Sequence, residues 1–158
     1  MTQRVDLATV MDRLAIDALV TGYAVALDDG DWEALAGLFT ATGRADHRTA
    51  GGIEGGVEEM VAWLAGTMAR YSVRQHLYVN RQVTVEQVDG GPGDTARVRA
   101  DYLRPLRPSP DAGPVSLSGG RCLFIVARTP AGWRIDRLTV QEKWRQAHAG
   151  PYRNGPGL

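Results

Sequence analysis

The stretch Tyr23-Ala-Val-Ala-Leu-Asp-Asp-Gly-Asp-Trp32 decides the fold, because one helix ends within it and the next begins. Upstream of Gly30, apolar residues recur at the spacing of one buried helical face: Ile16, Leu19, Val20, Tyr23 and Leu27. Gly30 follows the last of them and favours the left-handed conformation that ends a helix. Asp31 is suited to cap the free N–H groups of the next helix. The stretch therefore predicts two consecutive helices that meet at Gly30.

Asp28 needs a different explanation from Asp31. It lies one i,i+4 step beyond Ala24, at the edge of the apolar face, so its carboxylate is directed toward the interior. Asp29 lies about 100° further round the helix and points away. An acid directed at an apolar interior must be paired, protonated or functional. Asp28 is therefore a candidate site residue, with a salt bridge or a loop cap as the structural alternative.

The composition predicts one domain that binds neither nucleic acid nor membranes. The 158 residues include 18 basic and 18 acidic side chains, so no net charge attracts a polyanion. No apolar run is long enough to span a bilayer and no signal-peptide core follows Met1, so we expect a cytoplasmic protein. The single cysteine, Cys122, excludes an internal disulfide and is expected to be a buried strand residue. We expect a domain over residues 1–149 and a flexible Gly- and Pro-rich tail over 150–158.

The spacing of apolar residues changes from helical to alternating near Ser72. Before it we expect helices over about 9–27, capped by Thr9 with Asp12, then from Asp31 through Phe39 and from near Gly56, with residues 43–52 as a strand or strand-like turn. After it we expect strands at about 73–88, 95–107, 116–128 and 133–144. This order predicts an α+β domain in which helices cover one face of an antiparallel sheet. A sheet that curls around helices leaves a cavity at its open end.

Alternation along the strands nominates the residues that could reach such a cavity. Residues 74, 76, 78 and 80 share one strand face, so His76 could meet Asp28. A carboxylate that accepts from one imidazole nitrogen fixes the tautomer and leaves the other nitrogen free to act as acid or base. On the return strand Arg97, Arg99 and Asp101 lie opposite Val98, Ala100 and Tyr102, and alternation alone does not decide which set faces inward.

The chain resembles a SnoaL-like domain of the nuclear transport factor 2-like superfamily over roughly residues 8–146. The residues that carry the resemblance are Tyr23, Leu27-Asp28, Gly30-Asp31-Trp32, Leu35, Leu38-Phe39, Asp46-His47, Gln75-His76, Asn80, Gly132-Trp133-Arg134-Ile135 and Trp144. The resemblance implies a cone of curved antiparallel sheet around three helices, a deep apolar pocket and often a homodimer through the outer sheet face. Members include dehydratases, isomerases, an epoxide hydrolase, polyketide cyclases and non-catalytic binders, so the fold does not fix the function.

Within that superfamily the chain is most similar to the scytalone and bile acid dehydratases. The resemblance places Asp28 on their pocket aspartate, His76 on their catalytic histidine, and His47 where a tyrosine binds the substrate carbonyl. Tyr23 stands five residues before Asp28, as a functional tyrosine does in bile acid dehydratases. On a regular helix that interval is about 140°, so Tyr23 and Asp28 converge only if the last turn unwinds. Asp101 is the nearest counterpart of a second pocket histidine, and Arg121 and Leu123 replace a serine and an asparagine.

Together these observations predict a cofactor-free lyase or isomerase, of the dehydratase type, that acts on a small hydrophobic, oxygenated substrate and forms a homodimer. Its predicted catalytic residues are Asp28, His76, Tyr23 and Asp101; its predicted substrate-binding residues are His47, Asn80, Arg121, Tyr78 and Trp63, with no metal. Three alternatives stay open. They are a polyketide cyclase, an epoxide hydrolase that uses Arg99 and Asp101, and a non-catalytic binding protein.

Overall fold

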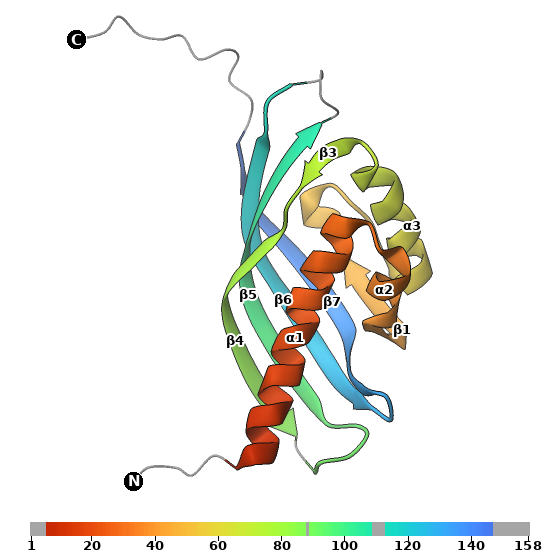
Figure 1. Ribbon diagram of the computed structural model, residues 1–158, viewed down its shortest axis with the longest axis vertical. Helices are drawn as coiled ribbons and strands as arrows, with labels where there is room; N and C mark the ends of the chain where they lie inside the picture. Colours follow the sequence, from red (N-terminus) through yellow and green to blue (C-terminus); the bar gives the residue numbers. More distant parts are fainter. Residues whose placement is uncertain (1–5, 88, 109–112, 147–158) are drawn as a thin grey trace, which may run out of the picture.

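Three helices pack against the concave face of one curved seven-stranded sheet (Figure 1). The computed structural model describes residues 6–87, 89–108 and 113–146, so the expected tail over 150–158 lies outside the described residues. The elements in chain order are α1 (Leu7–Asp29), α2 (Trp32–Gly37), β1 (Phe39–Asp46), the 3-10 turn η1 (Arg48–Ala50), β2 (Glu54–Gly56), α3 (Val57–Met68), β3 (Tyr71–Arg74), β4 (Leu77–Gln87), β5 (Thr95–Pro108), β6 (Ser116–Thr129) and β7 (Gly132–Arg145).

Helix α1 ends as the sequence predicts but begins earlier. Gly30 adopts φ 71° and ends the helix in the left-handed conformation. The expected cap pair of Thr9 and Asp12 is wrong: Asp6 is the N-cap, and its carboxylate accepts the Thr9 backbone N–H at 2.7 Å. Thr9 therefore lies inside the first turn, and Asp12 is free to act elsewhere. The predicted apolar stripe of α1 is buried against the sheet.

Helix α2 is shorter than the apolar spacing predicts. Asp31 caps it by accepting the Ala34 backbone N–H at 3.0 Å, as expected. Phe39, expected to continue its apolar stripe, instead opens strand β1 opposite Ile135 of β7. Phe39 remains buried, because a strand that packs against the core can bury an apolar side chain as well as a helix can.

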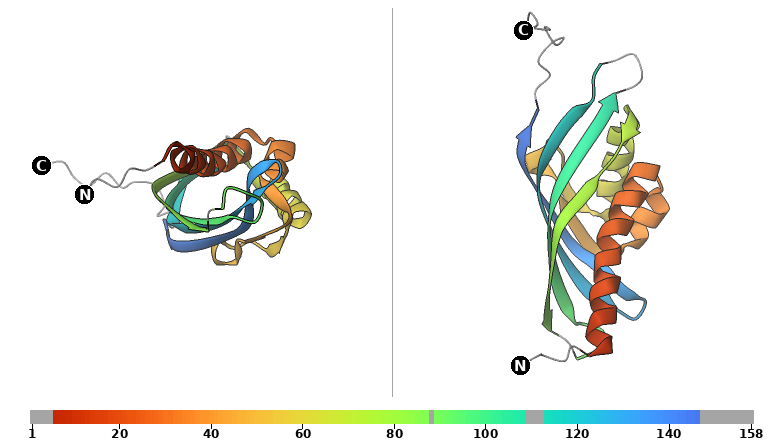
Figure 2. Two further views of the ribbon diagram at one scale, coloured as in Figure 1. Left: turned by 90° about the horizontal axis from the view of Figure 1, so that it is seen from below. Right: turned by 60° about the vertical axis from the view of Figure 1, so that its left-hand side comes forward.

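The sheet is mixed and open, with strand order β2-β1-β7-β6-β5-β3 and β4 also paired with β5. Strand β1 runs parallel to β7, and the other pairs are antiparallel. Seen along its length, the sheet curls around α1 and the other helices (Figure 2). The predicted α+β class, with helices on one face of a curved sheet, is confirmed. Among the described helices none is long and apolar enough to cross a membrane.

The segment predicted as one strand over 73–88 is two strands, β3 and β4, that pair with different parts of β5. Strand β3 pairs with residues 106–108 and β4 with residues 95–103. The interruption falls at Gln75 and His76. It frees the backbone N–H of His76 from the sheet, and Asp28 of α1 accepts that N–H at 2.8 Å. The break thus fixes His76 beside α1.

Candidate functional site

A cavity of about 350 Å³ opens between the helices and the concave face of the sheet. Its wall is mostly apolar and aromatic, as small-molecule sites usually are, with a few polar side chains among them. The lining residues are Tyr23, Leu27, His47, Ala50, Gly51, Trp63, Leu64, Thr67, Met68, Arg70, Tyr71, His76, Tyr78, Tyr102, Arg104, Leu106, Cys122, Val140 and Arg145.

Asp28 and His76 meet at the inner wall through two hydrogen bonds. One carboxylate oxygen lies 2.6 Å from Nδ1 of the imidazole, and the other accepts the His76 backbone N–H at 2.8 Å. His76 lines the cavity and is 9% exposed, whereas the described cavity wall does not include Asp28. The carboxylate therefore lies behind the imidazole and holds it from the side of α1. The predicted meeting of these two residues is confirmed as a contact.

This contact determines which imidazole nitrogen is available to a ligand. An ionised carboxylate only accepts hydrogen bonds, so Nδ1 of His76 carries the proton and Nε2 carries the lone pair. Burial lowers the pKa of His76, and the charge and hydrogen bond of Asp28 oppose that shift. At neutral pH the imidazole is uncharged, so Nε2 can take a proton from a bound molecule.

Tyr23 and His47 form a second polar pair in the wall. The Tyr23 hydroxyl lies 3.2 Å from Nε2 of His47, and both side chains are buried. Burial lowers the pKa of His47 to about 4, so this imidazole is also neutral at pH 7. Its Nδ1 has no hydrogen-bond partner among the described residues. Helix α1 stays regular through Asp29, so Tyr23 contacts His47 and does not converge on Asp28.

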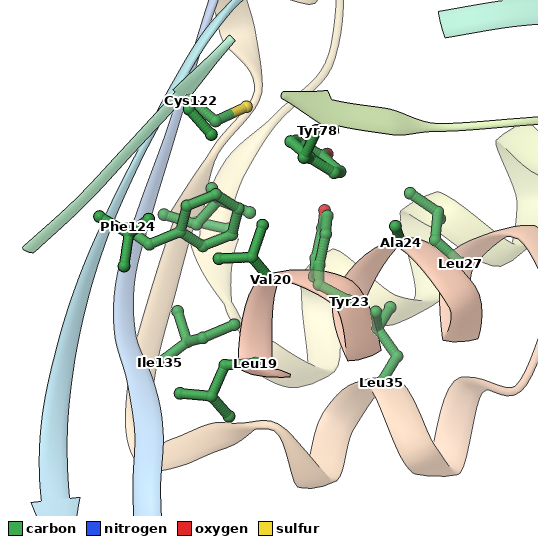
Figure 3. Close-up of a cluster of buried hydrophobic side chains, with 14 of the residues drawn as sticks. Leu19, Val20, Tyr23, Ala24, Leu27, Leu35, Tyr78, Cys122, Phe124 and Ile135 are labelled. Carbon is green, nitrogen blue, oxygen red and sulfur yellow. The ribbon is translucent and has the colours of Figure 1, made fainter. Parts of the chain in front are cut away.

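A cluster of aromatic rings connects this pair to the sheet. Tyr23 points from α1 toward the sheet, between Tyr78 and Phe124, with ring centroids 6.0 and 5.9 Å away (Figure 3). Burial raises the pKa of Tyr23 and Tyr78, so both stay protonated and can donate hydrogen bonds. Burial also raises the pKa of Cys122 to about 12, which excludes a thiolate nucleophile here.

Trp63 of α3 reaches the cavity beside His47, with 5.2 Å between ring centroids. Gly52 makes this position possible. A Cβ atom at Gly52 would collide with the Trp63 ring and would lie 2.8 Å from Cβ of His47. The loop after η1 therefore closes over the indole only because residue 52 has no side chain.

Asp101, Asn80 and Arg121 do not lie in the cavity. Strand β5 turns Tyr102 inward, where it is 4% exposed, and Asp101 outward, where Arg121 donates to it at 2.9 Å. Asn80 bonds the same carboxylate at 3.1 Å, because the register of β4 shifts between Val79 and Gln82 and turns Asn80 to the outer face with φ 52°. The placement of these three residues in the pocket is wrong, and exposed Arg99 lies on this outer face too.

Arg104 and Tyr102 are cavity residues that the sequence did not nominate. Arg104 is one strand repeat from Tyr102, and its side chain is 13% exposed. It donates to Glu142 at 3.0 Å and to Ser118 at 3.2 Å. Burial raises the pKa of Tyr102 to about 12, and its hydroxyl has no partner among the described residues. Once Tyr102 is known to face inward, period-2 alternation places Arg104 on the same face, but it does not supply the partner that a buried guanidinium needs.

Comparison with known proteins gives one family and several structural neighbours. The family model of the SnoaL-like domain matches residues 8–139. An uncharacterized protein of Mycobacterium tuberculosis strain H37Rv is 32% identical over 130 residues, which are 82% of this chain and 84% of that protein.

Two solved structures from Novosphingobium aromaticivorans share the fold. One, provisionally named an aromatic ring hydroxylase, superposes with TM-score 0.72 at 30% identity over 82% of this chain and 87% of that one. The other, provisionally named a scytalone dehydratase, gives TM-score 0.74 at 19% identity over 96% and 97%. The second likeness shows the fold alone. The family match spans most of the described helices and strands, including Tyr23, Asp28, His47 and His76, and the chain therefore belongs to the SnoaL-like domain family.

Proposed function

We propose that this chain is an acid–base enzyme, a lyase or isomerase, that acts on a small hydrophobic molecule carrying a carbonyl and a hydroxyl group. The observation that carries the proposal is the 2.6 Å contact of Asp28 with Nδ1 of His76, which lines the cavity. A buried, neutral imidazole whose tautomer is fixed by a carboxylate is suited to proton transfer near pH 7. The fold shared with a provisionally named scytalone dehydratase supports the same class of chemistry by analogy.

In the proposed elimination, Nε2 of His76 removes a proton from the carbon next to the carbonyl. The electron pair of that C–H bond moves to form an enolate, and the bond to the neighbouring hydroxyl then breaks. The imidazolium returns its proton to the departing oxygen, so water leaves and an unsaturated ketone remains. If the same proton returns instead to another carbon, the product is an isomer. Asp28 stabilises the transient imidazolium without entering the reaction.

The Tyr23–His47 pair is positioned to polarise the carbonyl. Both groups are uncharged, and the hydrogen bond between them uses one of their two donors, so the pair keeps one N–H or O–H for the carbonyl. In a buried wall a hydrogen bond to a developing oxyanion is stronger than in water. Nδ1 of His47 and the hydroxyl of Tyr102 are two further buried polar atoms that have no hydrogen-bond partner among the described residues. We propose Tyr78 and Trp63 as the walls that hold its apolar body.

A cyclase that begins with the same proton removal uses the same residues, so we include polyketide cyclisation within this proposal. An epoxide hydrolase built on Arg99 and Asp101 has no support from the geometry, because both residues lie on the outer face of the sheet.

A titration of the His76 imidazole by NMR tests the proposed pair without a substrate. In the wild type we expect a pKa below about 6.5. In Asp28→Asn we expect a further fall, because the carboxylate charge no longer stabilises the imidazolium. The matched control is Asp29→Asn, the neighbouring exposed acid, which should leave the titration unchanged. If the pKa of His76 is the same in the wild type and in Asp28→Asn, the two groups are not coupled and the proposal loses its basis.

Turnover of a panel of hydrophobic β-hydroxy ketones, each with and without a carboxylate group, then separates an enzyme from a binding protein. His76→Gln should lower kcat by about 10²- to 10⁴-fold. Asp101→Asn, an acid-to-amide change on the outer face, should leave kcat unchanged. If the wild type retains every panel member bound but unaltered, the chain is a binder, and the lyase proposal fails.

We also propose that the outer sheet face forms a homodimer. Leu77, Leu103 and Trp144 are between 38% and 43% exposed, and the register aligns them across β4, β5 and β7, with Trp144 covering Gly119 of β6. Such a row is apolar and continuous, as homodimer interfaces are. Sedimentation of wild type and Leu103→Lys should show a dimer and a monomer, respectively, and a monomeric wild type would exclude this interface.

A further inference from the structure

The charged side chains in the cavity wall all have the same sign. Arg70, Arg104 and Arg145 line the cavity, and no aspartate or glutamate does among its described lining residues. The two histidines of the wall, His47 and His76, have lowered pKa values and are neutral near pH 7. In an apolar cavity whose only charged groups are cationic, an anionic ligand is favoured over a neutral one, and a cationic ligand is disfavoured.

One carboxylate outside the wall, Glu142, compensates part of this charge. Its Oε2 accepts from Arg104 and from Arg145, at 3.0 Å each, and its Oε1 accepts from Arg145 at 2.9 Å. Two guanidinium groups thus share one carboxylate. Because an arginine carries five N–H donors in a planar fork, both retain donors that Glu142 does not occupy.

Arg70 has no acidic partner among the described residues. It follows the end of α3, is exposed, and its Nε donates only to the Thr67 carbonyl at 3.4 Å. Arg145 ends β7, and the ends of α3 and β7 both lie in the upper half of Figure 1. Arg70 and Arg145, both exposed, therefore line the outer part of the cavity, and the less exposed Arg104 lies deeper.

We propose that the substrate of this site is a hydrophobic acid, whose anionic head group is bound by Arg70 and Arg145 at the cavity mouth while its apolar body extends toward His76. Guanidinium groups match the geometry of carboxylate and sulfonate oxygens and bind them through paired hydrogen bonds. The inference rests on the proposed function only in taking the cavity as the substrate site. A bound anion would also offset the charge of Arg104, which acts to lower the pKa of both wall histidines.

Two fluorescent probes that differ by one sulfonate test this inference. 8-Anilinonaphthalene-1-sulfonate carries the anion, and N-phenyl-1-naphthylamine is the same chromophore without it. We expect the wild type to bind the sulfonate about tenfold more tightly than the neutral probe, and to lose this preference at high NaCl concentration. Thr67→Trp, which fills the cavity, should abolish binding of both probes. Equal affinities in the wild type, or probe binding that survives Thr67→Trp, would overturn the inference.

The arginines are then tested as a pair. In Arg70→Gln/Arg145→Gln the preference for the sulfonate should fall to about one, with affinity for the neutral probe unchanged. The matched control is Arg99→Gln/Arg137→Gln, which removes the same charge from exposed positions outside the cavity wall and should keep the preference. Thermal unfolding verifies that each variant is folded. If both double variants lose the preference for the sulfonate equally, the net charge of the protein causes that preference rather than Arg70 and Arg145, and the inference is wrong.

His76→Gln separates this inference from the proposed function. The variant should keep the preference for the sulfonate probe, because His76 is not one of the two arginines, Arg70 and Arg145, that are proposed to bind the anion. Loss of turnover with the preference intact supports both proposals. Retained turnover in His76→Gln overturns the proposed mechanism alone, whereas a wild type without preference overturns the hydrophobic-acid substrate alone.

Discussion

The Tyr23 hydroxyl lies 3.2 Å from Nε2 of His47, and this pair joins α1 to the end of β1 across the cavity wall. Removing the hydroxyl leaves both nitrogens of His47 without a partner in a buried setting. We expect Tyr23→Phe to fold, because the ring still fills the core, with a loss of about 1–3 kcal/mol in the free energy of unfolding. Turnover should fall by about 10²-fold, since one carbonyl donor is lost.

Urea unfolding and steady-state kinetics measure the two effects. Tyr78→Phe is the control, because its ring packs against Tyr23 without a hydrogen bond to His47. We expect a smaller loss of turnover there. Equal turnover in Tyr23→Phe and wild type would exclude Tyr23 from the chemistry.

Acid should destabilise this protein in a window set by its buried histidines. The pKa of His47 is about 4 in the folded state, against 6.5 for an unperturbed histidine, so the unfolded chain binds more protons between these values. Stability therefore falls as the pH drops from about 6.5 to 4, by up to about 3 kcal/mol from His47, and His76 acts in the same direction. Asp12, Asp46 and Asp94 have lowered pKa values and lose their contributions only below 3.8.

Urea unfolding of wild type and His47→Gln across that pH window measures this dependence. The variant should show a shallower loss of stability, with the remaining slope contributed by His76. If the two curves are parallel, His47 titrates normally and is not buried as the structure has it.

Arg128 should contribute more to stability than an arginine on the sheet surface. It donates to Asp12 at 2.6 Å and to Asp94 at 3.3 Å, and its guanidinium lies 4.6 Å from the centroid of the Trp133 ring. Arg128→Gln leaves two mostly buried carboxylates without their cation, so we expect a loss of about 2–3 kcal/mol in chemical unfolding. The control Arg97→Gln breaks an exposed pair with Glu86 and should cost below about 1 kcal/mol.

Gly52→Ala should reduce ligand binding without unfolding the protein. The added methyl group would collide with Trp63 and force the indole away from the loop, so the cavity beside His47 changes shape. We expect a several-fold weaker affinity for either naphthalene probe, measured by fluorescence titration. Gly66→Ala on α3 is the control, because its Cβ meets nothing within 4 Å; it should keep the affinity and add about 0.5–1 kcal/mol of stability. Unchanged binding in Gly52→Ala would show that Trp63 does not shape the ligand site.

The sequence predicts those features that depend on local spacing. Apolar residues at helical intervals identify α1, and the position of Asp28 on its edge leads to the contact with His76. The expected inward placement holds for His76 and Tyr78, although the strand breaks before Leu77, and it fails at Asn80, because an irregularity in the pairing of β4 with β5 turns that side chain outward. Such an irregularity depends on the partner strand, and nothing in residues 74–80 signals it.

The face of β5 is a second feature that local spacing leaves open. Arg97, Arg99 and Asp101 alternate with Val98, Ala100 and Tyr102, and either set could face inward by period alone. Burial of the apolar set decides the question, and it also brings Arg104 inside, where Glu142 pairs with it. Because that partner comes from β7, about forty residues later in the chain, pattern reasoning within one strand could not justify a buried arginine.

The parallel pairing of β1 with β7 sets the order in which the site can be assembled. Apart from the short hairpin with β2, strand β1 joins the sheet only through β7, the last described strand. His47 lies directly after β1, so its position opposite Tyr23 depends on the pairing of β1 with β7. Strand β7 lies nearly a hundred residues further along the chain. Completion of the cavity therefore depends on a non-local strand pairing, and we expect it to be a late event in folding.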